Sequence, residues 1–409
     1  MPRAAREERH SVVVDFGSEL RKSPLEKSTG RVTSETKTGK SWVDHPVNLA
    51  ELKRLYDPHH SRCLRLKAMC AVGLGWEKEG GGELKLPGSK NGETAQDILN
   101  EVADDVEDVG GGCLELVMNG GGKIGEMNWV PAAQCRFSVD RARIQQSAGS
   151  GKTAEWAVWN GKWPVGEKSC ILYIAQEGTW STYYGEPDWL GCMDSLMLAT
   201  SARLYLRKLL DNNCIPPFMA TIIGSGLSDK PKTDPTTGKQ MPSPLEELVK
   251  SFERNFKGAA NAGKALFQSL PNTDAKIQVE KLGSSLGDTK DLIQILQGSR
   301  DEIVSSHGVP PRLVGIVSSG QLGGGGEILG QLQLFDQILI QDRHRIWQEA
   351  LNPVLPLMEG VTAGTRIAFR GLDLESLNAG TTGAGTMDPI ARVDQILRAA
   401  TRKGRVYRG

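Results

Sequence analysis

The sequence predicts an α+β fold in which long helices alternate with blocks of short strands. Apolar residues recur at helical spacing over residues 188–213, 288–307 and 327–352, which predicts three long helices. Between residues 113 and 130, two strand-like runs flank the turn sequence NGGG, and this pattern predicts a β-hairpin. A chain of 409 residues is long enough for two or three domains with a sizeable core.

The charge balance excludes a global attraction to nucleic acid or to an anionic membrane. The chain carries 49 Lys and Arg against 49 Asp and Glu, so its formal net charge is zero. It has no apolar run of roughly 20 residues, so no membrane span is expected. The highly charged residues 1–9 lack the apolar segment of a secretory signal.

The seven cysteines are scattered singly and never form a C-x-x-C pair. An odd count with this spacing indicates reduced, mostly buried thiols in an intracellular protein. We therefore expect neither a disulfide framework nor a structural zinc site.

The N-terminal third of the chain predicts an arm followed by helices and strands. Residues 1–44 are rich in charged and hydroxyl side chains and poor in apolar ones, which predicts an arm that is ordered only against a neighbour. Residues 47–72 predict two helices, and residues 94–108 predict a third. After the hairpin, further short strands are expected at 134–139, 154–159 and 170–175.

A small separate unit is expected between two of the long helices. The helix over 188–213 begins after Pro187 and ends before Pro216 and Pro217, because proline lacks the N–H donor that a helix interior needs. Residues 218–282 then show a strand, a polar loop, a helix and two more strands. This order predicts a compact β-α-β-β unit.

The stretch from residue 288 to 351 predicts two packed helices that hold a glycine-rich loop between them. The first helix ends before the VPP sequence at 309–311, and the second starts at Glu327. Within this loop, residues 317–326 are uncharged and end in four consecutive glycines, the residue with the largest backbone freedom. The loop is interpreted as a plain surface connection, a phosphate-binding loop or a mobile lid. Glu327 and the lack of a following lysine disfavour phosphate.

Two motif-like sequences do not support a catalytic or metal site. GSGKT at 149–153 resembles a Walker loop, but the first required glycine would fall at Gln146 and no buried strand precedes it. His59 and His60 cannot both face one metal from a helix, so we interpret them as a surface or cap pair. Neither a nucleophile elbow nor an acid/base pair stands out. We expect no catalytic residue, no cofactor and no metal.

Five sequence elements carry a resemblance to a known protein family. They are PVNLAEL at 46–52 followed by His60, YYGEPDWL at 183–190, NCIPP at 213–217, KGAANAGK at 257–264 and VPPRLVGI at 309–316. In this order they are similar to elements of the portal proteins of tailed bacteriophages, in particular the PBSX-like and P2-like portals. YYGEPDWL is the most specific of the five. The two ends of the chain match no motif of the family.

The resemblance implies a portal fold assembled as a ring of about twelve subunits at one capsid vertex. In chain order, it implies an N-terminal arm (1–44), the N-terminal part of a wing (45–187), a first stem helix (188–214), a clip (215–287), a second stem helix (288–308), a tunnel loop (309–326), the C-terminal part of the wing (327–378), and a linker with a crown helix and tail (379–409). Twelve helices packed 8–10 Å apart would enclose a hole of about 25 Å, wide enough for a duplex.

The resemblance also implies which residues face the DNA and the partner proteins. The uncharged tunnel-loop residues would line the passage: Val317, Ser318, Ser319, Gly320, Gln321, Leu322, Gly323, Gly324, Gly325 and Gly326. Polar and basic residues of the clip would face partners: Lys230, Lys232, Lys239, Lys257, Asn261 and Lys264. An uncharged loop suits a passage with little friction, because every phosphate that a cation neutralises adds affinity.

A portal implies a structural role in DNA packaging and ejection, without an active site or cofactor of its own. The implied partners are other copies of the chain, double-stranded DNA, the terminase large subunit, head–tail adaptor or connector proteins and the major capsid protein. The implied location is the portal vertex of the virion, after assembly in the host cytoplasm. Two alternatives stay open: a nucleic-acid-processing enzyme with a mobile Gly-rich lid, which predicts carboxylates or His near residue 320, and another phage structural ring such as an adaptor or tail ring.

Overall fold

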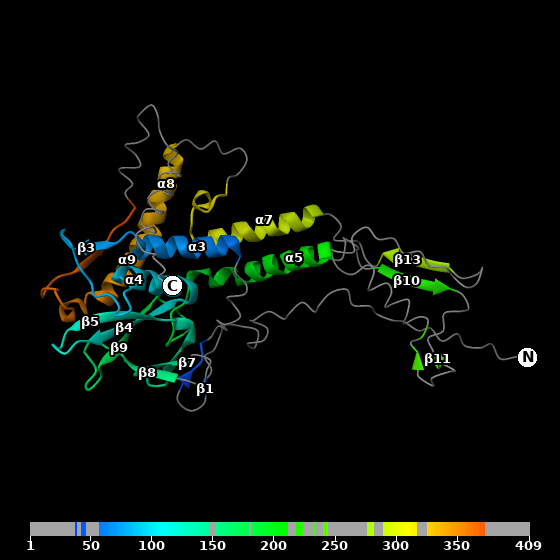
Figure 1. Cartoon of the computed structure of the whole chain (residues 1–409). Coiled ribbons are helices and arrows are strands. Elements are labelled where there is room, and N and C mark those ends of the chain that lie inside the picture. Colours follow the sequence, from blue (N-terminus) through cyan, green and yellow to red (C-terminus); the bar gives the residue numbers. More distant parts are fainter. Residues whose placement is uncertain are drawn as a thin grey trace, which may run out of the picture. The chain divides into compact units, whose positions relative to one another are not determined.

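The chain divides into two compact units in a computed structural model (Figure 1). The smaller unit comprises Met1–Lys22 and Leu198–Gly298, and the larger comprises Ser23–Met197 and Ser299–Gly409. The chain passes from the larger unit to the smaller within helix α5 (Met193–Asp211) and returns within α7 (Thr289–Ser306). The structure describes residues 37–38, 42–45, 57–147, 153–179, 181–211, 218–223, 232–233, 240–241, 243, 276–281, 289–316 and 325–372.

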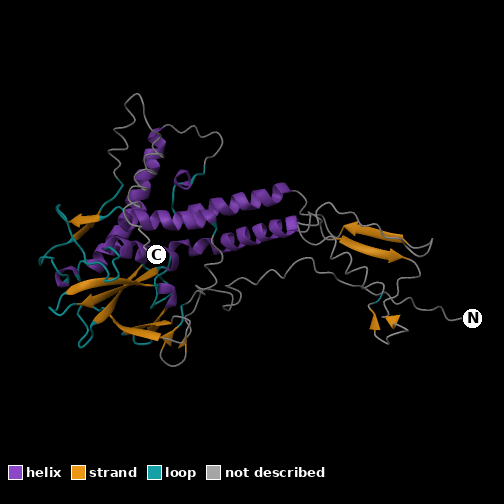
Figure 2. Cartoon of the chain, in the orientation of Figure 1, coloured by secondary structure: helices purple, strands orange, loops and turns teal. Residues whose placement is uncertain are grey.

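An eight-stranded sheet forms the centre of the larger unit (Figure 2). Its strands are β1 (Lys37–Thr38), β2 (Trp42–Val43), β4 (Gly111–Met118), β5 (Ile124–Val130), β6 (Cys135–Ser138), β7 (Arg143–Ser147), β8 (Thr153–Val158) and β9 (Ser169–Ala175). They lie in the order β1-β2-β6-β7-β8-β9-β4-β5. Only the β8–β9 pair is parallel among these described strands.

The larger unit also contains helices and short strands outside this sheet. The helical elements are α3 (Pro58–Ala68), the π-helix η2 (Met69–Gly73), α4 (Ala95–Val109), the 3₁₀ turns η3 (Ala132–Gln134), η4 (Asp188–Cys192) and η6 (Pro311–Val314), α8 (Gly325–Phe335), the π-helix η7 (Asp336–Ile340), α9 (Gln341–Leu351) and the 3₁₀ turn η8 (Leu355–Leu357). Strand β3 (Trp76–Lys78) pairs with β14 (Ile367–Phe369) as a separate antiparallel ribbon.

Helix α4 lies over one face of the sheet, and its two ends are set by its sequence. Thr94 and Asp97 form a reciprocal capping box at its start, and Gly110 ends it in the left-handed region with φ of 83°. Its apolar side packs on alternate residues of β4 and β9 and on α9. This cluster includes Ile98, Leu99, Val102, Val106, Leu114, Leu116, Leu172, Ile174, Trp347 and Leu351.

The opposite face of the same strands builds a second core, because successive strand residues point to opposite faces. Cys113 and Ile171, the neighbours of Leu114 and Leu172, belong to this second cluster. Residues from the aromatic segment after β9, the first turns of α5 and the end of α7 join it, namely Tyr184, Trp189, Leu196 and Ile303. Both faces of the sheet are therefore covered by apolar contacts.

The smaller unit is described through its strands and parts of two helices. Strand β10 (Phe218–Ile223) pairs with β13 (Lys276–Lys281) in antiparallel register from Phe218↔Lys281 to Ile223↔Lys276. The short strands β11 (Lys232–Thr233) and β12 (Gln240–Met241) form a second antiparallel pair. The first and last strands of the predicted β-α-β-β unit are thus confirmed, and they pair with each other.

The predicted hairpin, the strands after it and the helices over 94–108 and 288–307 are confirmed by β4, β5, β6, β8, β9, α4 and α7. Strand β7 was not predicted, because its polar sequence RIQQS shows no apolar alternation. The GSGKT sequence falls between β7 and β8, which pair as a hairpin, whereas a Walker loop joins a strand to a helix. Residues 42–43 of the predicted arm form β2, which pairs with β6.

The predicted helix over 327–352 differs in two respects. It begins at Gly325, so Gly325 and Gly326 belong to the first turn of α8 and not to a loop. It also contains the π-helix η7, which changes the direction in which the following residues point. The helices predicted within 47–55, 244–258 and 389–402 and the strand at 265–269 lie outside the described residues. No helix in the described part of the chain is long and apolar enough to span a membrane.

Candidate functional site

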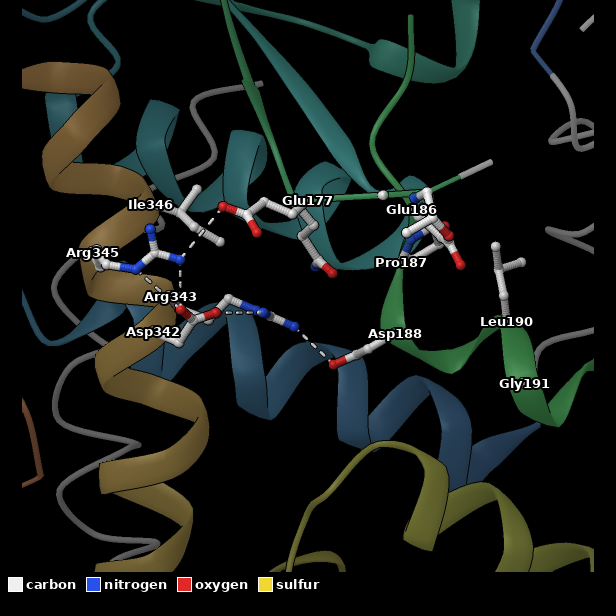
Figure 3. A pocket seen from close by; sticks show the side chains of 13 residues that line it. Glu177, Glu186, Pro187, Asp188, Leu190, Gly191, Asp342, Arg343, Arg345 and Ile346 are labelled. Carbon is white, nitrogen blue, oxygen red and sulfur yellow. Dashed lines mark hydrogen bonds and ion pairs between the residues drawn. The ribbon is translucent and has the colours of Figure 1, made fainter. Parts of the chain in front are cut away.

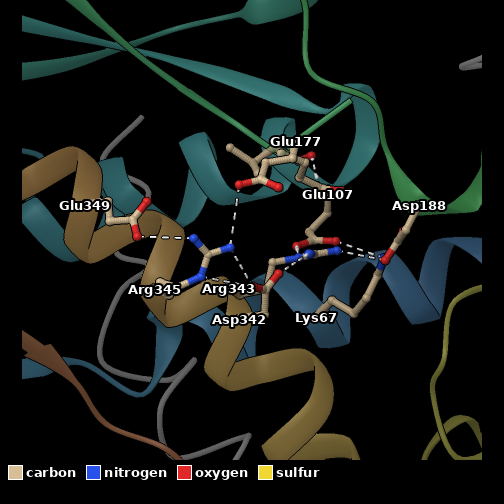
Figure 4. A network of polar contacts seen from close by, with 10 residues as sticks. Lys67, Glu107, Glu177, Asp188, Asp342, Arg343, Arg345 and Glu349 are labelled. Carbon is tan, nitrogen blue, oxygen red and sulfur yellow. Dashed lines mark hydrogen bonds and ion pairs between the residues drawn. The ribbon is translucent and has the colours of Figure 1, made fainter. Parts of the chain in front are cut away.

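Four charged side chains from four elements form a closed, buried ring in the larger unit (Figure 4). The Lys67 Nζ of α3 lies 2.9 Å from Glu107 Oε2 of α4 and 2.6 Å from Asp188 Oδ1 of η4. Arg343 of α9 completes the ring, with Nε 2.7 Å from Glu107 Oε1 and one terminal nitrogen 2.7 Å from Asp188 Oδ2. Cations and anions alternate around the ring, so its formal charge is zero.

Local sequence places each member of this charge ring at a helix position that faces inward. Lys67 follows the buried Leu64 by three residues, which puts it on the same side of α3. Asp188 follows Pro187 and opens η4, while Glu107 lies in the last turn of α4. Lys67 and Glu107 are fully buried, whereas the Asp188 side chain is 30% exposed. Asp188 therefore connects the ring to the surface.

The charges hold one another in the ionised state. Burial alone would raise the pKa of Glu107, but Lys67 and Arg343 outweigh it and lower the pKa below its usual value. Burial alone would lower the pKa of Arg343, but the Glu107 and Asp188 carboxylates raise it. Burying charges costs desolvation energy, and this cost is offset only when each buried charge contacts an opposite charge. This ring satisfies that condition with four contacts of 2.6–2.9 Å between opposite charges.

Two histidines and a tryptophan lie beside the charge ring. The Trp189 indole N–H donates to the carbonyl oxygens of Glu107 and Asp108, both at 3.1 Å. The His60 ring meets the Trp189 ring edge-on at 4.7 Å, and its Nδ1 lies 2.9 Å from Nε2 of His307. Burial and the nearby Lys67 lower the pKa of His60 to about 4 and that of His307 to about 2. Both imidazoles are therefore neutral at pH 7.

The predicted His59–His60 cap pair is confirmed in one part. Both backbone N–H groups donate to Oδ1 of Asp57, at 2.7 and 3.3 Å, and this caps helix α3. The His60 side chain, however, is buried against His307 and not on the surface. Among the described residues, no group of three or more His, Cys, Asp or Glu could hold a metal ion.

The YYGEPDWL element at 183–190 brings several parts of the larger unit together. The Tyr184 hydroxyl donates to the Val43 carbonyl at 2.6 Å and accepts from the Phe137 N–H at 3.1 Å. Gly185 crosses Gly110 so closely that a Cβ on Gly185 would lie 2.0 Å from the Gly110 carbonyl oxygen. The element thus connects β2, β6, the end of α4 and the charge ring.

The VPPRLVGI element at 309–316 packs against α3. Val309, Leu313 and Ile316 are buried in one cluster with Cys63 and Leu66 of that helix. The segment is compact because it forms the 3₁₀ turn η6, and Gly315 ends that turn with φ of 83°. Two of the five motif elements, far apart in the sequence, therefore meet the same helix.

A pocket of about 660 Å³ opens beside the charge ring (Figure 3). Its charged lining consists of four carboxylates and two guanidinium groups, from Glu177, Glu186, Asp188, Asp342, Arg343 and Arg345. Both arginines already bind carboxylates, since Arg345 lies 2.9 Å from Asp342 and Arg343 belongs to the charge ring. A negative lining with its cations engaged is unsuited to a phosphate group.

The residues predicted to face DNA or partners are only partly described. Residues 317–324 of the tunnel loop and Lys230, Lys239, Lys257, Asn261 and Lys264 of the clip lie outside the described residues. Gly325 and Gly326 begin α8, and Lys232 lies in β11. The charge ring was not predicted. The sequence does contain one indication of it, because Lys67 falls on the same side of helix α3 as its buried apolar residues.

The family model of the phage portal protein matches residues 89–379. No curated protein matches the chain by sequence. Of the solved structures, the virion of a native gene transfer agent (GTA) particle contains a chain with a TM-score of 0.54 and 19% sequence identity, covering 90% of this chain and 93% of that chain.

Two GTA necks show the same fold. A chain from the neck of an empty particle with C6 symmetry has a TM-score of 0.52 and 18% identity, covering 88% of this chain and 91% of that one. A chain from the neck of a native particle with C12 symmetry has a TM-score of 0.53 and 16% identity, covering 88% of this chain and 94% of that one. Because the family model matches more than half of its residues, the chain belongs to the phage portal protein family.

Proposed function

We propose that copies of this chain assemble into the portal ring of a phage or phage-like particle, through which double-stranded DNA enters and leaves. The observation that carries the proposal is the match of the portal family model over residues 89–379. It is supported by the fold, which extends over nine tenths of the chain in a GTA particle and recurs in necks with C6 and C12 symmetry. In this role the chain is part of the virion.

The parts of the chain fit this role as follows. Helices α5 and α7 form the stem, the unit with β10 and β13 forms the clip, and the larger unit forms the wing. The clip contacts the terminase and the head–tail adaptor proteins, and the wing faces the capsid. The chain is a conduit, and ATP hydrolysis belongs to the terminase. Assembly takes place in the host cytoplasm.

Residues 317–326 form the narrowest part of the channel in this proposal. Their sequence VSSGQLGGGG carries no charge, so twelve-fold repetition adds no cation that could hold phosphates. Gly323 and Gly324, the two glycines that precede α8, allow neighbouring loops to move out of step while DNA passes. The competing function, an enzyme with a Gly-rich lid, needs carboxylates or histidines that converge near residue 320. No observation on the described residues favours it.

The test is electron microscopy together with mass determination on the purified full-length chain. We expect rings of about twelve subunits with a central hole of about 25 Å, the size that packed stem helices would enclose. A protein that stays monomeric or dimeric at all concentrations, with or without DNA and scaffold-like crowding agents, would contradict the proposal.

A further inference from the structure

The helical rod α8–η7–α9 presents two different sides. Leu332, Phe335 and Ile340 point into the core and are buried, whereas Leu334 and Ile338 remain 58% and 72% exposed. The two exposed residues are four positions apart, so they form one apolar stripe. Large apolar side chains that stay exposed next to each other indicate a surface with an absent partner.

The stripe is free of charge along its length. The exposed residues next to it are Gln333, Gln337 and Gln341, and the one ionisable residue between 328 and 341, Asp336, is buried. Its carboxylate is turned inward and accepts from the backbone N–H of Leu372 at 3.4 Å. With no Lys or Arg to neutralise a phosphate, the stripe is unsuited to DNA.

One turn further along, the same rod becomes charged. Arg345 binds Asp342 at 2.9 Å and Glu349 at 3.1 Å, and Asp342 and Arg345 border the pocket beside the charge ring. An apolar centre with a rim of internally paired charges is the usual layout of a protein–protein interface. The layout therefore favours a protein partner over a nucleic acid.

We propose that the stripe formed by Leu334 and Ile338 is a contact between neighbouring copies of this chain. This inference rests on the proposed ring. In a closed ring, each copy uses one surface patch to contact a different patch of the next copy, and every charge in the contact is repeated at each subunit. An uncharged apolar stripe places no charge in the contact, so no charge is repeated around the ring. Two side chains cannot make a whole interface, so they act as its buried anchors.

The first experiment introduces a charge into the stripe. The variants Leu334→Glu and Ile338→Glu are compared with Val165→Glu, which adds the same charge at a fully exposed valine in the loop between β8 and β9. Mass photometry measures the protein concentration at which half of the subunits are in rings. We expect each stripe variant to raise this concentration at least tenfold and Val165→Glu to leave it within a factor of two.

A second experiment does not depend on disrupting the ring. The variant Ile338→Cys is assembled, and its reaction rate with a maleimide is compared with that of the same variant unfolded in urea and with wild-type protein, which corrects for native thiols. We expect at least tenfold protection in the ring, whereas Val165→Cys should react in the ring nearly as fast as in urea. The six described cysteines are buried and give little background.

The outcomes separate this inference from the proposed function. If rings form but Ile338→Cys reacts in them as fast as in urea, or if both glutamate variants assemble like wild type, the stripe is not a subunit contact and the portal proposal stands. If wild-type protein forms no ring under any condition, the portal proposal is wrong, and this inference is then wrong as well.

Discussion

Glu107 is the residue on which both buried cations converge, because Lys67 and Arg343 each bind one of its carboxylate oxygens. If either cation were removed, the remaining cation would still contact both Glu107 and the partly exposed Asp188. Removal of Glu107 instead leaves two buried cations that share Asp188, and Arg343 keeps one longer contact of 3.7 Å to Asp342. The charge ring is therefore most sensitive at this single carboxylate.

Replacing Glu107 by Ala is expected to destabilise the protein by roughly 3–5 kcal/mol, the range for a buried charge left without its partner. Urea denaturation followed by circular dichroism measures the change. Arg345→Ala is the control, because Arg345 binds three carboxylates but on the surface, where ion pairs contribute little. Equal effects of the two variants would contradict the role given to the buried charge ring.

The neutral His60–His307 pair predicts a loss of stability in mild acid. In the unfolded chain His60 titrates near 6.5, whereas burial and Lys67 lower its pKa in the folded protein to about 4. Between these two values only the unfolded state binds the proton, so stability falls as the pH falls through this window and levels off near pH 4. For His60 alone the loss is roughly 3 kcal/mol, at 1.36 kcal/mol per pH unit.

The pH prediction is checked by denaturation at pH 7 and pH 4.5. The double variant His60→Gln with His307→Gln is expected to be less stable at pH 7 but to show a smaller loss between the two pH values. His59→Gln is the control, because the neighbouring His59 is not part of the buried pair. An unchanged loss in the double variant would show that other groups cause the acid sensitivity.

At the scale of the elements, the crossing of Gly185 over Gly110 sets how closely the YYGEPDWL element approaches α4. Gly185→Ala would place a Cβ 2.0 Å from one backbone oxygen and 2.9 Å from another, that of Gln176. Neither backbone can move without disturbing the sheet. We expect a destabilisation of roughly 1–3 kcal/mol, the range for overpacking, and a lower melting temperature.

Gly298→Ala is the matched control for this substitution. Gly298 lies inside helix α7, and a Cβ there would meet no atom within 4 Å. Since glycine is a poor helix residue, alanine is expected to stabilise by roughly 0.5–1 kcal/mol. If Gly185→Ala behaves like Gly298→Ala, the close crossing is not a structural constraint.

The elements that the sequence predicts well are those whose signals are local. Helix α4 follows from its apolar spacing, and the β4–β5 hairpin follows from its NGGG turn. Strand β7 has no such signal, because its hydrogen bonds to β6 and β8, and not its side chains, make it a strand. The π-helix η7 likewise has no local sequence pattern that predicts it, because it depends on packing.

The candidate site depends on contacts between distant residues, and the sequence alone could not predict it. Lys67 and Arg343 are 276 positions apart, and they meet only because α3 and α9 pack near the same end of α4. The resemblance to portal proteins correctly singled out the element that contains Asp188 and Trp189. It gave no indication that a lysine, a glutamate and an arginine elsewhere would bind to it.

At the scale of the whole molecule, the proposed tunnel loop gives a prediction about DNA retention, because residues 317–326 carry no charge. The double variant Ser318→Lys with Ser319→Lys adds two cations per subunit, which the proposed ring would repeat around its channel. Binding of double-stranded DNA to the ring is expected to become tighter at low salt and to depend more steeply on salt concentration. Filter binding across a salt series measures both quantities.

The control for the loop variant places the same charge elsewhere. Asn160→Lys adds a cation at an exposed position of the loop between β8 and β9. It is expected to leave the salt dependence of DNA binding nearly unchanged. An equal effect of both variants would mean that residues 318 and 319 are no closer to the DNA than this loop is.

The burial of the described cysteines has a consequence for the life of a particle outside the cell. Burial raises the pKa of Cys63, Cys70 and Cys170 to about 12. At neutral pH only on the order of one in 10⁵ of these thiols is then the reactive thiolate. These three thiols are therefore poor targets for oxidation by air or peroxide. The proposed ring could leave reducing surroundings and keep its subunits free of accidental disulfides at these positions.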